Sequence, residues 1–404
     1  MHPVMKPALR RGWRDRETAQ FGMTPAHALT LGPMDPATRD FLDLLNGTRG
    51  LPLLREEGHR MDLPAGHVDT LLARLTRAGL VDDARGGGPA ADALRARTDV
   101  LRRLRPDLAA LSLTTTEPGG ALARLAARRA LRVQVRGAGR VGAVLASVLS
   151  GAGVGEVDVH DAGRVEPWDV APGGLPAESL GERRDTAARA AVRRAAPDRP
   201  PRRAHSPGSG AHDPGLSLVI LTHRDDVAVH APDPADADPL LASGTPHLYA
   251  GVVENTGVVG PLVLPGESPC ARCLHLDRAD RDPDWPRLTV QWRCARAHRV
   301  PACDLTLATA VAGLAAAHAL AFLDEQSPSS TGTRWEVSAP GLNWHARPVR
   351  PHPACGCGAA ERPKEEHSST GGDARATMAV QRPSPERRRT TGAARPTGTW
   401  RAHV

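Results

Sequence analysis

The sequence predicts an α/β protein with a Rossmann-like mixed sheet across residues 130–358 and a structural metal site near the end of that domain. Three observations carry this prediction. A glycine-rich turn joins a strand to a helix, an acidic residue ends the next strand, and two close pairs of cysteines lie far apart in the chain. A hydrophobic content of 40% provides enough apolar surface for a domain of this size.

The first observation is a βαβ unit with a phosphate-binding turn. Its parts are a strand at 130–135, the turn at 137–142, a helix at 141–149 and a strand at 155–161. Gly137 allows the tight turn, Gly139 lets a phosphate approach the backbone, and Gly142 lets the helix pack closely. The helix N-terminus favours an anion. Asp161, at the end of the second strand, is placed to accept ribose hydroxyls. This pattern suits NAD or FAD as well as ATP.

Four cysteines form the candidate metal site. Cys270 and Cys273 make a CxxC pair, and Cys355 and Cys357 make a CxC pair. Two such pairs complete a tetrahedral sulfur cage for Zn²⁺, with no ligand position left open for catalysis. The alternative is four thiols without a ligand.

A fifth cysteine is a candidate nucleophile. Cys303 precedes an apolar helix at 305–323. A thiol at a helix N-terminus can have a lowered pKa, which would activate it. A small buried core residue is the alternative interpretation.

The pattern of short strands and small helices expected in residues 1–85 resembles a small winged-helix-like α+β domain. Short strands are expected at 18–22 and 27–32, and Asp35 is a suitable N-cap for the following helix. A DNA-binding winged helix and a helical accessory or dimerisation domain are the alternatives.

Residues 86–129 are expected to form a linker and a helix. Residues 359–404, rich in Pro, Gly, Ser, Thr and Arg, are expected to be a disordered tail.

The charge balance does not indicate nucleic-acid binding. The net charge is +7, and the tail alone contributes +4, with nine basic and five acidic residues. The excess is therefore not clustered on a recognition element. We find no signal-peptide pattern and no run of about 18 apolar residues that would span a membrane. A cytoplasmic protein with reduced cysteines is expected.

The order of these motifs resembles the ThiF/MoeB/HesA family, which includes activating enzymes of ubiquitin-like proteins. The ending at 352–358, His-Pro-Ala-Cys-Gly-Cys-Gly, resembles the ThiF-like proteins of azole-peptide biosynthesis, whose N-terminal part is a PqqD-like peptide clamp. The resemblance implies an ATP-dependent adenylyltransferase acting on the carboxylate of a small protein or leader-type peptide. It implies ATP and Zn²⁺ as ligands and a homodimer, with Gly137, Gly139, Gly142 and Asp161 in the nucleotide site.

The sequence departs from the family pattern around the phosphates. Pro172 and Gly173 replace an Arg and a Gln, and His223 stands where the family has the Asp that handles Mg²⁺. Arg184, or its neighbour Arg183, takes the place of a Lys and is expected to pair with phosphate. Asp225 or Asp226, two or three residues further on, is expected to substitute for the missing Asp. These changes leave Mg²⁺ in doubt.

Three functional hypotheses follow. The first is an adenylyltransferase with Arg184, Asp225 and Cys303 as candidate catalytic residues. The second is a catalytically degenerate scaffold that binds and presents a peptide. The third is an NAD(P)-dependent oxidoreductase, against which the four cysteines argue.

Overall fold

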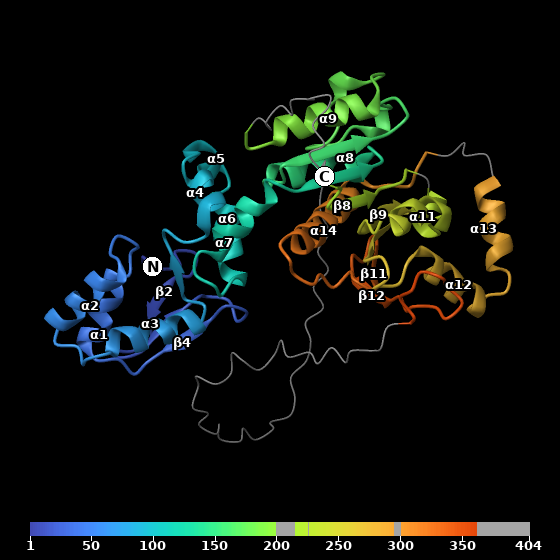
Figure 1. Cartoon of the computed structure of the whole chain (residues 1–404). Helices are drawn as coiled ribbons and strands as arrows, with labels where there is room; N and C mark the ends of the chain where they lie inside the picture. Colours follow the sequence, from blue (N-terminus) through green and yellow to red (C-terminus); the bar gives the residue numbers. More distant parts are fainter. Residues whose placement is uncertain (199–214, 225, 295–299, 362–404) are drawn as a thin grey trace, which may run out of the picture.

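The computed structural model describes residues 1–198, 215–224, 226–294 and 300–361. It consists of an N-terminal lobe, a group of four helices and a larger α/β domain, arranged in that order along the chain (Figure 1). The predicted disordered tail lies outside the described residues beyond position 361, and the candidate Asp225 lies outside them as well.

The N-terminal lobe contains two small antiparallel sheets and three helices. The predicted strands at 18–22 and 27–32 are confirmed as β3 and β4, which pair with each other. Asp35 caps the next helix, since its carboxylate accepts from the Thr38 N–H at 2.8 Å. Strand β2 was not predicted, because its three residues are all exposed and show no apolar alternation. The elements are β1 (Pro3–Met5), β2 (Arg11–Trp13), β3 (Ala19–Phe21), β4 (Leu29–Leu31), α1 (Pro36–Phe41), η1 (Leu42–Leu44), α2 (Leu51–Arg60), α3 (His67–Arg77) and β5 (Val81–Asp83), which pairs with β1.

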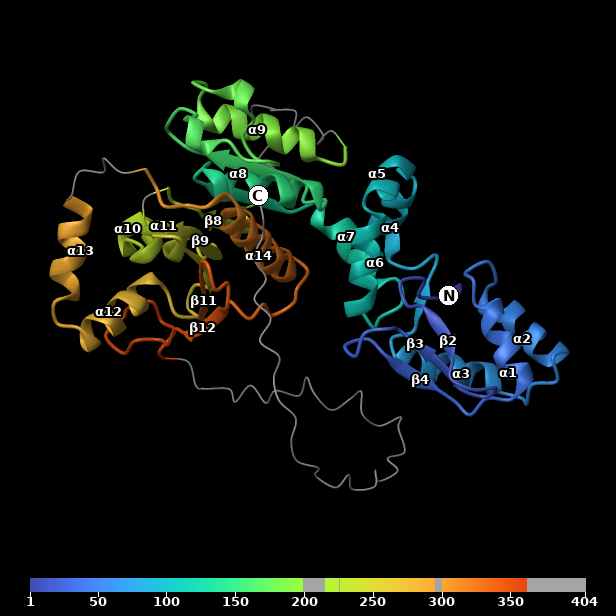
Figure 2. The same ribbon diagram turned by 180° about the vertical axis from the view of Figure 1, so that it is seen from behind.

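Residues 86–129 contain four helices where we expected a linker and one helix. These are α4 (Gly88–Arg95), α5 (Thr98–Arg103), α6 (Arg105–Thr114) and α7 (Gly120–Arg128). They bury a small core of their own around Leu94, Leu104 and Leu125. Lys6 of the N-terminal lobe reaches this group, and its Nζ donates to the carbonyls of Ser112 and Thr115 at 2.6 Å each. The helices therefore form a packed layer between lobe and domain (Figure 2).

The α/β domain is built on a seven-stranded mixed sheet in the order β12-β11-β10-β9-β8-β6-β7. The four strands from β7 to β9 are parallel and the remaining pairings are antiparallel. The predicted βαβ unit is confirmed by the parallel pairing of β6 and β7. The strands are β6 (Arg132–Arg136), β7 (Glu156–His160), β8 (Leu218–Leu221), β9 (His247–Val253), β10 (Thr256–Val263), β11 (Thr333–Ser338) and β12 (Trp344–Pro348).

Both faces of the sheet are covered, as the fully buried strand β8 illustrates. Leu218 and Ile220 face the core shared with α8 and α14, whereas Val219 and Leu221 face the core shared with α11 and α12. Alternation to opposite faces places the two sets on different cores. The helices are α8 (Arg140–Gly151), α9 (Arg184–Ala195), α10 (Asp226–His230), α11 (Pro234–Ala242), α12 (Ala271–Arg281), α13 (Trp285–Cys294) and α14 (Leu305–Leu323).

Helix α14 is the one described helix long and apolar enough to cross a membrane. Its residues Ala308, Ala312 and Ala315 are fully buried in the core that it shares with α8 and the sheet. Small side chains let the two helices approach closely. One face of α14 therefore belongs to the core of the α/β domain.

Candidate functional site

The predicted glycine turn lies between the end of β6 and the start of α8. Gly137 has a φ of +108°, which only glycine adopts readily. A Cβ at this position would lie 2.0 Å from the carbonyl oxygen of Thr222, which follows β8. The turn is therefore pressed against the neighbouring strand end, and Gly137 is required for both conformation and space.

Gly142 is equally constrained by contact. A Cβ there would lie 2.1 Å from the Gly137 carbonyl oxygen and 2.4 Å from Thr222 Oγ1. Thr222 Oγ1 itself donates to the Gly137 carbonyl at 2.9 Å. Gly142 thus packs the first turn of α8 directly onto the glycine turn and the end of β8.

Replacing Gly142 by Ala should therefore distort the turn. We expect a loss of stability of about 1–3 kcal/mol, the usual range for overpacking, together with a loss of nucleotide binding. Gly313→Ala is the matched control, because Gly313 lies in α14 and has no atom within 4 Å of an added Cβ. That change should be neutral or stabilising by about 0.5–1 kcal/mol. Urea unfolding of both variants measures the difference, and equal stabilities would contradict the role given to Gly142.

Asp161 lies beside the turn and is held by three donors. Its carboxylate accepts from the Ala138 N–H at 2.8 Å, the Gly163 N–H at 2.9 Å and Arg184 Nε at 2.9 Å. Burial would raise the pKa of Asp161, but the two amides and the Arg184 charge outweigh it, so the pKa lies below its usual value. Asp161 is therefore a charged acceptor at the strand end, with its side chain only 7% exposed.

Arg184 is turned toward the protein rather than toward solvent. Besides Asp161, its guanidinium donates to the Arg164 carbonyl at 2.6 Å and lies 3.5 Å from an Asp169 oxygen. Its side chain is 10% exposed. Asp161 is thereby neutralised by Arg184, and the phosphate contact expected of Arg184 stays a prediction.

A second arginine, not singled out from the sequence, lies over the turn. Arg224 Nη2 donates to Asp169 at 2.6 Å and to Glu166 at 2.9 Å. Burial would lower the pKa of Arg224, but the bonds to Glu166 and Asp169 more than offset it, and the pKa is raised. The available sequence signal was its place just after β8, since the carboxyl ends of neighbouring parallel strands share one edge of the sheet.

A cavity of about 120 Å³ lies at the N-terminus of α8, and its lining includes Asp169 and Arg224 but neither Asp161 nor Arg184. Gly139, Arg224 and Cys303 line it, as does His223 at the position where the family has an Asp. Ligand pockets usually measure about 300–1,000 Å³. The cavity is thus smaller than a whole nucleotide would need. The full lining is residues 139–142, 168, 169, 222–224, 252, 300, 301 and 303.

Cys303 belongs to this cavity, but its pKa is not lowered. Burial raises the pKa of the Cys303 thiol, and the nearby charge of Arg140 only partly opposes this. The next residue, Asp304, adds a smaller effect of the same sign, and it caps α14 by accepting from the amides of Thr306 and Leu307. The helix N-terminus is therefore satisfied by a carboxylate. The expected lowering is not found, and a nucleophilic role for Cys303 stays a prediction.

The four predicted zinc ligands meet at one point. The sulfur atoms of Cys270, Cys273, Cys355 and Cys357 all lie within 4.8 Å of one another. The pairs Cys270–Cys355 and Cys273–Cys357 are 3.6 Å apart, and Cys270–Cys273 is 3.9 Å apart. A tetrahedral Zn²⁺ with bonds of about 2.3 Å needs sulfur atoms about 3.8 Å apart. The donor set therefore fits zinc, and it joins the start of α12 to the 355–358 turn.

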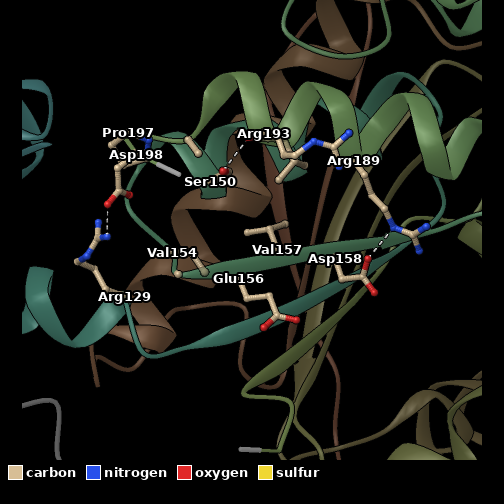
Figure 3. A pocket seen from close by; sticks show the side chains of 13 residues that line it. Arg129, Ser150, Val154, Glu156, Val157, Asp158, Arg189, Arg193, Pro197 and Asp198 are labelled. Atoms are coloured by element: carbon tan, nitrogen blue, oxygen red, sulfur yellow. Dashed lines mark hydrogen bonds and ion pairs between the residues drawn. The ribbon is translucent and has the colours of Figure 1, made fainter. Parts of the chain in front are cut away.

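A second cavity, of about 240 Å³, runs along the outer strand β7 beneath α9 (Figure 3). Two of its arginines are paired within the protein, Arg129 with Asp198 at 2.6 Å and Arg189 with Asp158 at 2.8 Å. It does not include the glycine turn or the cysteines. This cavity along β7 is thus separate from the candidate nucleotide site.

Together, the sheet, the glycine turn and the cysteine cluster define an α/β fold of the nucleotide-binding type with four cysteines placed to hold a metal ion. The ThiF family model matches residues 117–359, well over half of the chain, and the chain belongs to the ThiF family. The dehydrogenase hypothesis is set aside by this match. No curated protein matches the sequence.

Several solved structures share the fold of this chain at low sequence identity. Escherichia coli MccB with succinimide has a TM-score of 0.63 and 13% identity, covering 90% of this chain and 100% of that one. E. coli MccB with AMPCPP and MccA has a TM-score of 0.63 and 13% identity, covering 89% and 100%. PaaA has a TM-score of 0.58 and 14% identity, covering 85% and 99%. The likeness extends over the N-terminal lobe as well as the ThiF domain.

Proposed function

We propose that this chain is an ATP-dependent adenylyltransferase that activates a carboxylate of a small protein or leader-type peptide. The observation that carries the proposal is the glycine turn, with Gly137 and Gly142 both in close contact with the end of β8, opening onto a cavity at the α8 N-terminus. Such a turn offers backbone N–H groups and a positive dipole to phosphate. Structures of MccB with ATP, AMPCPP and MccA support the choice of ligands.

The reaction makes one bond and breaks one. A carboxylate oxygen of the acceptor attacks the α-phosphorus of ATP, the bond to the β-phosphate breaks, and pyrophosphate leaves with the electron pair. An acyl adenylate remains. Charge on the phosphates must be neutralised as this happens, by cationic side chains, by amides at the α8 N-terminus, or by Mg²⁺. Zinc at the four cysteines would hold the 355–358 turn on α12 and takes no part in this step.

The N-terminal lobe supplies a place for the peptide. Strand β2 is the edge of its three-stranded sheet, and all three of its residues are exposed. Beside it lies a cavity of about 230 Å³ lined by apolar side chains that include Leu9, Phe21 and Leu42. An extended peptide pairs with an exposed edge and places alternate side chains in such a groove. We therefore propose the lobe as the clamp for a leader-type peptide, with a cytoplasmic setting and a homodimeric assembly as parts of the same proposal.

The degenerate scaffold remains the second candidate, favoured by one observation. The cavity at the turn is small, and Arg224 covers Gly139 within it. In a scaffold this arrangement would persist and exclude ATP, whereas in an enzyme it would open when ATP binds.

Pyrophosphate exchange separates the two candidates. The protein is incubated with ATP, labelled pyrophosphate and a library of short peptides, with and without Mg²⁺. An adenylyltransferase should form labelled ATP with peptides that carry a free C-terminal carboxylate and not with the same library amidated at that end. Binding of ATP is measured separately by calorimetry. A protein that binds peptides but neither binds ATP nor exchanges label would be a scaffold.

A further inference from the structure

The most informative residue at the turn is Arg224, because its stem lies on the surface that a phosphate would approach. A Cβ at Gly139 would be 3.1 Å from Arg224 Cγ and 3.5 Å from its Nε. Gly139 has a φ of −80° and so is not needed for the backbone conformation. The absence of a side chain there leaves room for a group on the turn, and Arg224 fills it.

Two cations lie at the N-terminus of α8, and the carboxylates that balance Arg224 come from outside the helix. The first turn of α8 contains no acidic residue, and it begins with Arg140. Arg224 adds a second cation at the same end. Cations are unfavourable beside the positive end of a helix dipole, whereas an anion is stabilised there. Asp169 and Glu166 balance Arg224 here, and an anion bound between the two arginines and the amides of α8 would take over that role.

Arg224 can be released at lower cost than Arg184. Arg184 is 10% exposed and is the cation bonded to Asp161, so its departure would leave that buried charge with two backbone amides and no cation. Arg224 is 24% exposed. If Arg224 moves, the Asp169 carboxylate still accepts from the Glu166 N–H at 3.0 Å and still lies 3.5 Å from Arg184 Nη1. Glu166 is 42% exposed and is solvated without it.

We propose that Arg224 is the phosphate-binding cation of this site, held by Asp169 and Glu166 over the glycine turn until it transfers to the phosphates of the nucleotide. This inference rests on the proposed function. The planar guanidinium donates two parallel hydrogen bonds to one phosphate. In the family, an Asp at the position of His223 handles Mg²⁺. Arg224, the next residue, would supply positive charge to the phosphates from the protein itself. The role expected of Arg184 then belongs to Arg224, and Arg184 positions Asp161 instead.

Calorimetric titration of the full chain with ATP and with adenosine tests this assignment. Arg224→Gln should weaken ATP binding about 10- to 100-fold, the effect of one or two charged hydrogen bonds, and leave adenosine binding unchanged. Arg224→Lys keeps the charge and should lose less than Arg224→Gln. Arg189→Gln is the matched control, because Arg189 is a partly exposed arginine on α9 whose guanidinium bonds Asp158 at 2.8 Å. It should bind ATP as the wild type does.

The outcomes distinguish this inference from the proposed function. If the wild type binds no ATP, the proposed function fails and this inference fails with it. If the wild type binds ATP and Arg224→Gln binds it equally well, only the inference is overturned. Tighter ATP binding by Arg224→Gln would also overturn it, since Arg224 would then be blocking the site. Thermal unfolding of each variant, expected within about 3 °C of the wild type, confirms that a lost affinity is not a lost fold.

Discussion

Replacing Cys273 by Ser should remove zinc from the protein and destabilise the ThiF domain by about 4 kcal/mol or more. Cys273 is fully buried, and its sulfur lies 3.9 Å from Cys270 and 3.6 Å from Cys357. A hydroxyl is a poor zinc ligand, and three thiolates without a metal would repel one another in a buried site. Since the metal closes a loop of more than 80 residues between the two cysteine pairs, its loss also frees the 355–358 turn.

Zinc content and unfolding together measure this effect. Elemental analysis should find about one zinc per wild-type chain and little in Cys273→Ser. Cys294→Ser is the matched control, because Cys294 is exposed and lies outside the cluster. It should keep both zinc and stability. A wild-type protein without zinc, or a Cys273→Ser variant as stable as Cys294→Ser, would contradict a metal role for the four cysteines.

Replacing Arg128 by Met should cost about 3–5 kcal/mol. Arg128 on α7 bonds Asp324 at the end of α14 through two contacts of 2.7 and 2.6 Å, and it donates to the Ala152 carbonyl at 3.1 Å. The two side chains are 5% and 3% exposed. Without the guanidinium, Asp324 would remain as a buried, unpaired carboxylate. The pair joins the four-helix group to the ThiF domain, so its loss should also loosen their packing.

Two comparisons define the Arg128 effect. Arg55→Met should cost less than about 1 kcal/mol, because the bidentate pair of Arg55 with Asp69 is about half exposed. The double variant Arg128→Met with Asp324→Leu should recover most of the stability, since an apolar pair of similar volume is well tolerated. Chemical denaturation gives all three values. If Arg128→Met lowers the free energy of unfolding no more than Arg55→Met does, water must reach the Asp324 carboxylate.

Much of this fold was predictable because its signals are local. A strand, a glycine turn, a helix and a strand within about thirty residues identify a parallel βαβ unit, and β6, α8 and β7 are found where expected. Asp35 was predictable as a cap because capping uses adjacent residues. The four helices of residues 86–129 were harder to predict, because two of them are only six and eight residues long and show little periodicity.

The sequence predicted the glycine turn and the cysteines of the candidate site, but it did not predict which arginine lies over the turn. Gly137, Gly142 and the cysteines follow from residue type and spacing. The choice between Arg184 and Arg224 does not, because both are arginines near the expected place in the sequence. It depends on which guanidinium points at Asp161 and which lies over Gly139.

The sequence by itself determined the ThiF-type βαβ unit and the four cysteines that meet in one cluster, since the steric demands of a turn and the ligand chemistry of sulfur are properties of the residues themselves. Only the tertiary structure decided how charge is arranged at the site. Asp161, Glu166 and Asp169 follow β7, and Arg224 follows β8, yet β6 lies between those strands. Parallel strands bring their carboxyl ends to one edge whatever separates them along the chain, and that edge is where Arg224 meets the glycine turn.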